Sequence, residues 1–189
     1  MKPLTATLAF ILSIFFASAQ IIPIKNSLQT DIAKVISDYP NGFKNISGGE
    51  IIQNPQSTEF ESRVEIKDAK CKVIKYSSTT KEIFSWEAEM LKTEDFEEAS
   101  KKFRSYYNSL QHLSVNINGM NAVFKGEYIK PSESIKFTTI VFDAKDKNEE
   151  LSTLKIALVL ETEMLDWVIK IQVYDKQRDD RDKGPAIDK

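Results

Sequence analysis

The chain has 189 residues with 26 basic and 28 acidic side chains, and its formal net charge is −2 at pH 7. Charges of both signs that nearly balance argue against nucleic acid and against anionic membranes as partners. Cys71 is the single cysteine, so an intramolecular disulfide is excluded. One cysteine and one histidine, His112, cannot form a typical zinc site, which takes several nitrogen and sulfur ligands. We therefore expect neither a metal nor a cofactor.

The N-terminal residues 1–19 have the layout of a secretory signal peptide. Lys2 supplies a positive charge, residues 4–16 are mostly apolar, and Ala17-Ser18-Ala19 matches an A-x-A cleavage site. The apolar run is too short for a membrane span, which needs about 20 residues. We predict cleavage after Ala19, export to the periplasm or the medium, and no membrane span in the mature chain.

A short amphipathic helix is predicted over residues 27–38. Apolar side chains recur there at helical intervals, at Leu28, Ile32, Val35, Ile36 and Tyr39. Ser27 is the predicted N-cap, and Pro40-Asn41-Gly42 ends the helix.

Strands are predicted between residues 43 and 91. Residues 60–67 alternate strictly, with an inward set of Phe60, Ser62, Val64 and Ile66. Residues 84–90 repeat this alternation with Phe84, Trp86, Ala88 and Met90. A shorter strand, 71–76, lies between the two. Alternation of this kind predicts one packed and one solvated face, which is typical of an antiparallel sheet.

The clearest helix is predicted over residues 94–111. Its apolar stripe consists of Phe96, Ala99, Phe103, Tyr107 and Leu110. Thr93 is the predicted N-cap, and Glu94 and Asp95 lie in the first turn, where the helix dipole favours acidic side chains.

Further strands follow this helix, and their predicted ranges are 115–117, 121–129, 137–143, 154–161 and 167–174. The chain closes with residues 176–189, a mixed-charge tail that contains Gly184-Pro185 and few apolar side chains. We expect this tail to be disordered, because it has almost nothing to bury.

These elements predict an α+β fold in which an antiparallel β-sheet carries two α-helices packed on one face. Residues 20–175 are the predicted single domain. A weak internal similarity aligns Gly49-Glu50-Ile51-Ile52 with Gly126-Glu127-Tyr128-Ile129. It suggests halves at 20–91 and 92–175, which would form a tandem α-β4 pseudo-repeat. In architecture alone, this layout resembles the tandem helix-plus-sheet arrangement of secreted inhibitor proteins of the β-lactamase-inhibitor type.

The strands of the second half carry apolar side chains on both faces, which a half-solvated sheet should not do. Either the chain itself covers the outer face, or that face is open to a partner or a lipid-like ligand. Cover by the chain itself, or a central strand buried on both sides, is the simpler interpretation. The candidate ligand- or partner-binding residues of this face are Phe142, Val159, Val168 and Tyr174.

The sequence contains no motif that supports catalysis. No G-x-S-x-G elbow accompanies His112, and nothing in the flanking sequence indicates that Cys71 and His112 form a thiol dyad. We therefore predict an exported, non-catalytic binding module whose partner is a protein or an apolar small molecule. The alternatives are a hydrolase that uses carboxylates alone, and a structural or assembly subunit in which the apolar face forms an oligomer interface, for example in a homodimer.

Overall fold

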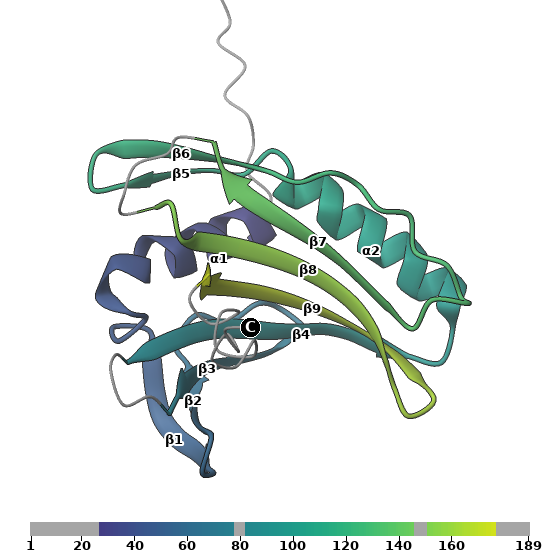
Figure 1. The fold of residues 1–189 in the computed structure, drawn as a ribbon, viewed down its shortest axis with the longest axis horizontal. Helices are drawn as coiled ribbons and strands as arrows, with labels where there is room; N and C mark the ends of the chain where they lie inside the picture. Colours follow the sequence, from purple (N-terminus) through teal and green to yellow (C-terminus); the bar gives the residue numbers. More distant parts are fainter. Residues whose placement is uncertain (1–26, 78–81, 146–150, 177–189) are drawn as a thin grey trace, which may run out of the picture.

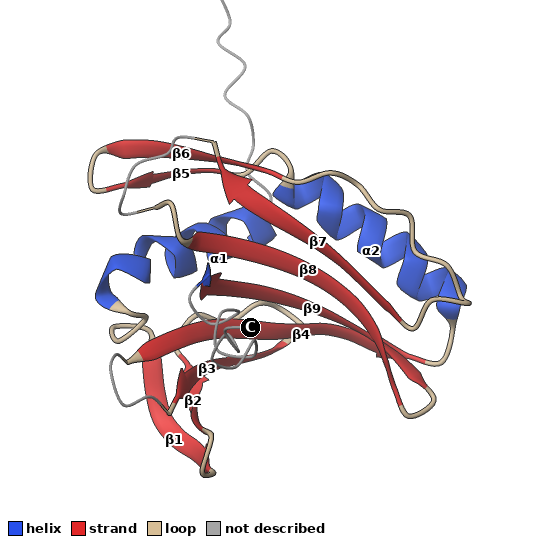
Figure 2. Cartoon of the chain, viewed as in Figure 1, coloured by secondary structure: helices blue, strands red, loops and turns tan. Residues whose placement is uncertain are grey.

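A computed structural model describes residues 27–77, 82–145 and 151–176 of the chain. The described strands form one nine-stranded antiparallel sheet in the order β1-β2-β3-β4-β9-β8-β7-β6-β5 (Figure 1). Two α-helices accompany this sheet (Figure 2). The predicted α+β class with an antiparallel sheet is therefore confirmed.

The strands run as two successive meanders, one after each helix. Their bounds are β1 (Ser47–Gln53), β2 (Ser57–Ser62), β3 (Lys70–Tyr76), β4 (Ile83–Thr93), β5 (Ser114–Ile117), β6 (Met120–Lys125), β7 (Phe137–Ala144), β8 (Leu154–Glu163) and β9 (Asp166–Asp175). The last strand of each meander, β4 and β9, pair with each other at the centre of the sheet. The first half supplies four strands and the second half five, and the pseudo-repeat is not confirmed.

The helices begin and end close to the predicted positions. Helix α1 spans Ser27–Ser37, and a 3-10 turn, η1 (Tyr39–Asn41), follows it. Helix α2 spans Phe96–Leu110. Its N-cap is Asp95 and not the predicted Thr93, because the Asp95 carboxylate accepts hydrogen bonds from the backbone N–H groups of Glu97 and Glu98.

One hydrophobic core lies between the helices and one face of the sheet. The apolar stripes of α1 and α2 pack there with alternate residues of the central strands, including Trp86, Leu158 and Ile171. Alternation along β4 and β9 is preserved, so this face is apolar along both central strands.

Two predicted strands are longer than the observed ones. The predicted strand 60–67 ends at Ser62, and Val64 and Ile66 are buried in an irregular segment that follows β2. The Ser62 hydroxyl accepts a hydrogen bond from the Val64 N–H and another from the Trp86 indole, which fixes the chain where β2 ends. The predicted strand 121–129 likewise ends at Lys125.

The predicted signal peptide, residues 1–19, and the tail from residue 177 onward lie outside the described residues. Neither of the described helices is long and apolar enough to cross a membrane.

Candidate functional site

The four predicted binding residues do not share one surface. Val159, Val168 and Tyr174 lie on the sheet face opposite the helices, as their positions in β8 and β9 require. Phe142 lies on the helix-covered face, where it is fully buried in the core and its ring centroid lies 5.8 Å from that of Tyr107. The placement of Phe142 on the outer face was therefore wrong. Phe142 alternates with Val141 along β7, and Val141 is the residue that points outward.

The remaining three side chains are buried, although they lie on the outer face. Val159 and Tyr174 form a small apolar cluster with Ala157. Lys170 is directly opposite Val159 in the strand register, and Lys155 is directly opposite Tyr174. Lysine side chains can cover apolar neighbours with their aliphatic stems while their charged ends reach ion-pair partners. Lys170 meets Glu161 and Glu163 in this way, and Lys155 meets Asp143.

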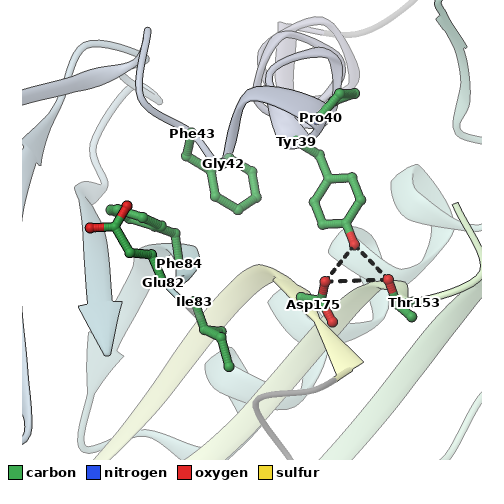
Figure 3. Close-up of a pocket in the computed structure, with 9 residues that line it drawn as sticks. All are labelled: Tyr39, Pro40, Gly42, Phe43, Glu82, Ile83, Phe84, Thr153 and Asp175. Atoms are coloured by element: carbon green, nitrogen blue, oxygen red, sulfur yellow. Dashed lines mark hydrogen bonds between the residues drawn. The ribbon is translucent and has the colours of Figure 1, made fainter. Parts of the chain in front are cut away.

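An open pocket of about 360 Å³ lies at the end of the sheet where β4 begins and β9 ends (Figure 3). Its lining comes from four segments far apart in the sequence. The lining residues are Tyr39, Pro40, Gly42, Phe43, Glu82, Ile83, Phe84, Thr153 and Asp175. Polar and apolar groups share this lining, which is the usual composition of a small-molecule site.

A hydrogen-bonded group of three side chains forms the polar wall of the pocket. The Tyr39 hydroxyl donates to Asp175 Oδ2 at 2.9 Å and lies 2.7 Å from Thr153 Oγ1 (Figure 3). Thr153 Oγ1 also lies 3.3 Å from Asp175 Oδ2. Burial raises the pKa of Tyr39 well above its usual range, so the phenol keeps its proton. The wall therefore presents hydroxyl and carboxylate groups in a fixed arrangement.

Aromatic rings form the apolar side of the pocket. Gly42 and Phe43 both have left-handed backbone conformations, with φ of 63° and 57°, and this bend brings the buried Phe43 ring to the pocket (Figure 3). The Phe43 ring meets the Tyr39 ring edge-on, with centroids 6.0 Å apart. A phenylalanine at positive φ is unusual, because only glycine adopts that conformation without strain. Such strain is typical of sites whose geometry is held by the surrounding structure.

The carboxylate of Asp38 stabilises this bend by accepting hydrogen bonds from residues that follow it in the chain. Asp38 is buried, and it accepts hydrogen bonds from the side-chain amides of Asn41 and Asn45 and from the backbone N–H groups of Asn45 and Ile46. A buried carboxylate is stable only when its oxygens are satisfied in this way. Asp38 therefore positions the segment that carries Tyr39 and Phe43.

Charged groups lie at the rim of the pocket. Glu82 forms ion pairs with Lys75 and with Lys44, the latter at 3.4 Å. The hydrogen bond from Lys75 lowers the pKa of Glu82, so this carboxyl is ionised at neutral pH. The Lys75 ammonium also lies 5.7 Å from the centroid of the Phe84 ring, which is within cation–π range.

The thiol and the imidazole considered in the sequence analysis do not lie in this pocket. Its lining contains neither Cys71 nor His112. Burial raises the pKa of the Cys71 thiol, which disfavours the reactive thiolate. Among residues 27–77, 82–145 and 151–176, histidine, cysteine and acidic side chains do not form a group that could hold a metal ion. The arrangement offers a ligand apolar contacts on one side and hydrogen bonds on the other.

Sequence reasoning missed this pocket. Tyr39 was predicted only as part of the apolar stripe of the first helix, and neither Thr153 nor Asp175 was singled out. The hydrogen-bonded positions are 114 and 136 residues apart, so no local pattern could join them. The turn around Pro40-Asn41-Gly42, recognised as the end of the helix, was the one available signal.

We compared the chain with protein-family models, with curated proteins and with solved structures. No protein-family model, no curated protein and no solved structure matched it.

Proposed function

We propose that this protein is an exported, non-catalytic binding protein that takes a small molecule with an apolar body in the pocket between η1 and the start of β4. The observation that carries the proposal is the pairing of two aromatic rings, Phe43 and Phe84, with a fixed polar wall made by Tyr39, Thr153 and Asp175. Pockets of a few hundred Å³ that combine apolar walls with a few convergent polar groups are the usual form of a ligand site.

The two sides of the pocket define the chemistry of the ligand. The apolar part of the ligand would contact Phe43, Phe84 and Ile83. One polar group of the ligand would form hydrogen bonds with the polar wall. Because the wall is already hydrogen-bonded within itself, it needs no rearrangement to stay in place when the pocket is empty or filled. Preorganisation of this kind lowers the free-energy cost of binding.

The test is titration of the mature chain with Nile red, an uncharged apolar dye, followed by fluorescence. We expect Phe84→Ala to weaken dye binding about tenfold, because loss of about 1.5 kcal/mol of apolar contact corresponds to that factor. Phe60→Ala is the matched control, since Phe60 is also a partly buried strand residue that packs on the core but does not line the pocket. Equal dye affinity for the two variants and the wild type would contradict the proposal.

Export is tested separately by mass spectrometry of the protein from its natural host. We expect the mature chain to begin at Gln20 and to be found outside the cytoplasm. A chain that retains residues 1–19 would contradict this part of the proposal.

A further inference from the structure

Two hydroxyl groups and one carboxylate meet in the polar wall of the pocket, so the protons of the wall can be counted. Tyr39 and Thr153 each carry one O–H proton. The ionised Asp175 carboxylate carries none, and it can only accept hydrogen bonds. Contacts of 2.7, 2.9 and 3.3 Å join the three oxygen atoms (Figure 3). Three contacts therefore share two protons.

Each arrangement of these protons that satisfies the carboxylate uses both of them inside the wall. When the Tyr39 proton points to Asp175, the Thr153 proton points to Asp175 or to the Tyr39 oxygen. When the Tyr39 proton points to Thr153, the Thr153 proton points to Asp175. Burial, and to a lesser extent the negative charge of Asp175, raise the pKa of Tyr39, so the phenol stays protonated at neutral pH. The wall therefore has no proton left for a ligand.

The wall does have acceptor capacity left for a ligand. A hydroxyl oxygen can accept hydrogen bonds as well as donate one. Between them, the oxygens of Tyr39 and Thr153 accept at most one of the hydrogen bonds inside the wall. A ligand group that donates a proton can therefore be satisfied here, whereas a ligand group that only accepts would face lone pairs.

The second carboxylate of the lining is also an acceptor. Among the described residues that line the pocket, Glu82 and Asp175 are the charged ones. Glu82 pairs with Lys75 and Lys44, which are not among the lining residues. An acidic group on the ligand would therefore meet carboxylates in the lining, while the nearby lysines are already engaged at the rim.

The backbone of the bend beside the wall offers no donor either. Pro40 has no N–H group. The Gly42 N–H donates to the Tyr39 carbonyl at 2.9 Å. The Phe43 N–H donates to the Asp38 carbonyl at 3.2 Å. The polar side chains of the pocket and this bend therefore agree in what they ask of a ligand.

We propose that the ligand of this pocket is an apolar molecule that carries a hydrogen-bond donor, a hydroxyl or an amine, and no acidic group. Its donor gives a hydrogen bond to the oxygens of the polar wall, and its apolar body lies against Phe43, Phe84 and Ile83. This inference rests on the proposed function, because it assigns the polar group of the same ligand. Sites that pair with one polar group discriminate against analogues that lack it, because unpaired buried groups are costly.

Three probes with the same naphthalene ring test the inference on the mature chain. The hydroxyl of 2-naphthol donates, the ether oxygen of 2-methoxynaphthalene only accepts, and 2-naphthoate is an anion. Each probe is titrated at neutral pH into the protein loaded with Nile red, and displacement of the dye gives its affinity. Nile red has no N–H or O–H group, so it reports on the apolar contacts. We expect 2-naphthol to bind about tenfold more tightly than 2-methoxynaphthalene, and 2-naphthoate to bind most weakly.

Asp175→Asn should weaken this preference, because the amide carries two N–H protons and adds donors to the wall. We expect the advantage of 2-naphthol to fall to about threefold or less in this variant. Asp143→Asn is the matched control, since Asp143 is an exposed residue of β7 that pairs with Lys155 and does not line the pocket. Circular dichroism checks that both variants are folded, and the probe series on the wild type needs neither of them.

The probe series separates failure of this inference from failure of the proposed function. If Nile red binds and Phe84→Ala weakens it, but 2-methoxynaphthalene or 2-naphthoate binds as tightly as 2-naphthol, the inference is overturned and the pocket stands. If Nile red does not bind, or binds Phe84→Ala equally, the proposed function fails and this inference fails with it. A fourth probe, 2-naphthylmethylamine, compares an ammonium with a hydroxyl as the donor, and we expect it also to bind more tightly than 2-methoxynaphthalene.

Discussion

At the scale of single residues, the candidate pocket depends on buried polar groups that are completely paired. Asp38 satisfies its carboxylate oxygens within one tight bend of the chain, and Tyr39 reaches across the molecule to Asp175. These adjacent residues therefore make different contacts. Asp38 stabilises the local backbone, whereas Tyr39 connects that backbone to β9 through a hydrogen bond. Buried polar groups of this kind stabilise a fold only while every partner remains.

Tyr39→Phe should lower the free energy of unfolding by about 1–2 kcal/mol, because it removes a hydroxyl that donates to a carboxylate. Urea unfolding followed by circular dichroism measures the change. Tyr106→Phe is the matched control, since the Tyr106 hydroxyl is also partly buried but its bond to the Met90 carbonyl is long, at 3.4 Å. An equal loss in both variants would show that the Tyr39 contact has no special weight.

At the scale of elements, the β8–β9 hairpin has a different character on each side. Its helix-facing residues enter the core, whereas its outer residues pair lysines with acids around a small apolar cluster. Although the outer face of the second half is apolar in sequence, its side chains Val159, Val168 and Tyr174 are buried. Exposed apolar side chains remain at the turn, Met164 and Leu165, and on the neighbouring β7, Phe137 and Val141.

Glu163→Gln tests the ionic support of this hairpin through its pH dependence. The hydrogen bond from Lys170 lowers the pKa of Glu163 in the folded state. The resulting stabilisation is therefore present above the unfolded value of about 4.3 and is lost as pH falls through the folded value. Because Glu163 is 39% exposed, solvent screens the pair, and we expect a loss of only about 0.5 kcal/mol at pH 7.

The measurement compares urea midpoints of Glu163→Gln and the wild type at pH 7 and at about pH 2, where the difference should vanish. Glu133→Gln serves as control, because Glu133 is an exposed loop residue. A difference that persists unchanged in acid would show that it does not arise from the charge of Glu163.

At the scale of the whole molecule, the pairing of β4 with β9 joins the two meanders into one sheet. Ala88 and Ile171 are partners in this register, and both are buried in the common core. Each half would therefore expose a long apolar strand edge if the other half unfolded alone. The two tryptophans report on the two sides of this seam, because Trp86 lies in β4 and Trp167 in β9.

We expect the chain to unfold in one cooperative transition. In Trp86→Phe and in Trp167→Phe, the fluorescence of the remaining tryptophan and the far-ultraviolet circular dichroism should give coincident urea midpoints within each variant. Each substitution will lower stability, so the comparison is made between probes and not between variants. Separated midpoints would mean that the halves are independent units.

The sequence by itself determined the class of fold and the place of most elements. Alternation in residues 84–90 and helical spacing around Phe103 reflect which side chains are buried, and burial at fixed intervals is a local property. The same reasoning extended residues 60–67 too far, because Val64 and Ile66 are buried without being in a strand.

Only the tertiary structure decided the candidate sites. The side chains of Tyr39, Thr153 and Asp175 meet because the sheet brings the end of β9 to the turn after α1, and no spacing in the sequence encodes that meeting. The placement of Phe142 in the core also required the register of β7 against β8, since a shift of one residue exchanges the two faces of a strand. Local order follows from periodic burial, whereas sites follow from which distant segments the sheet places side by side.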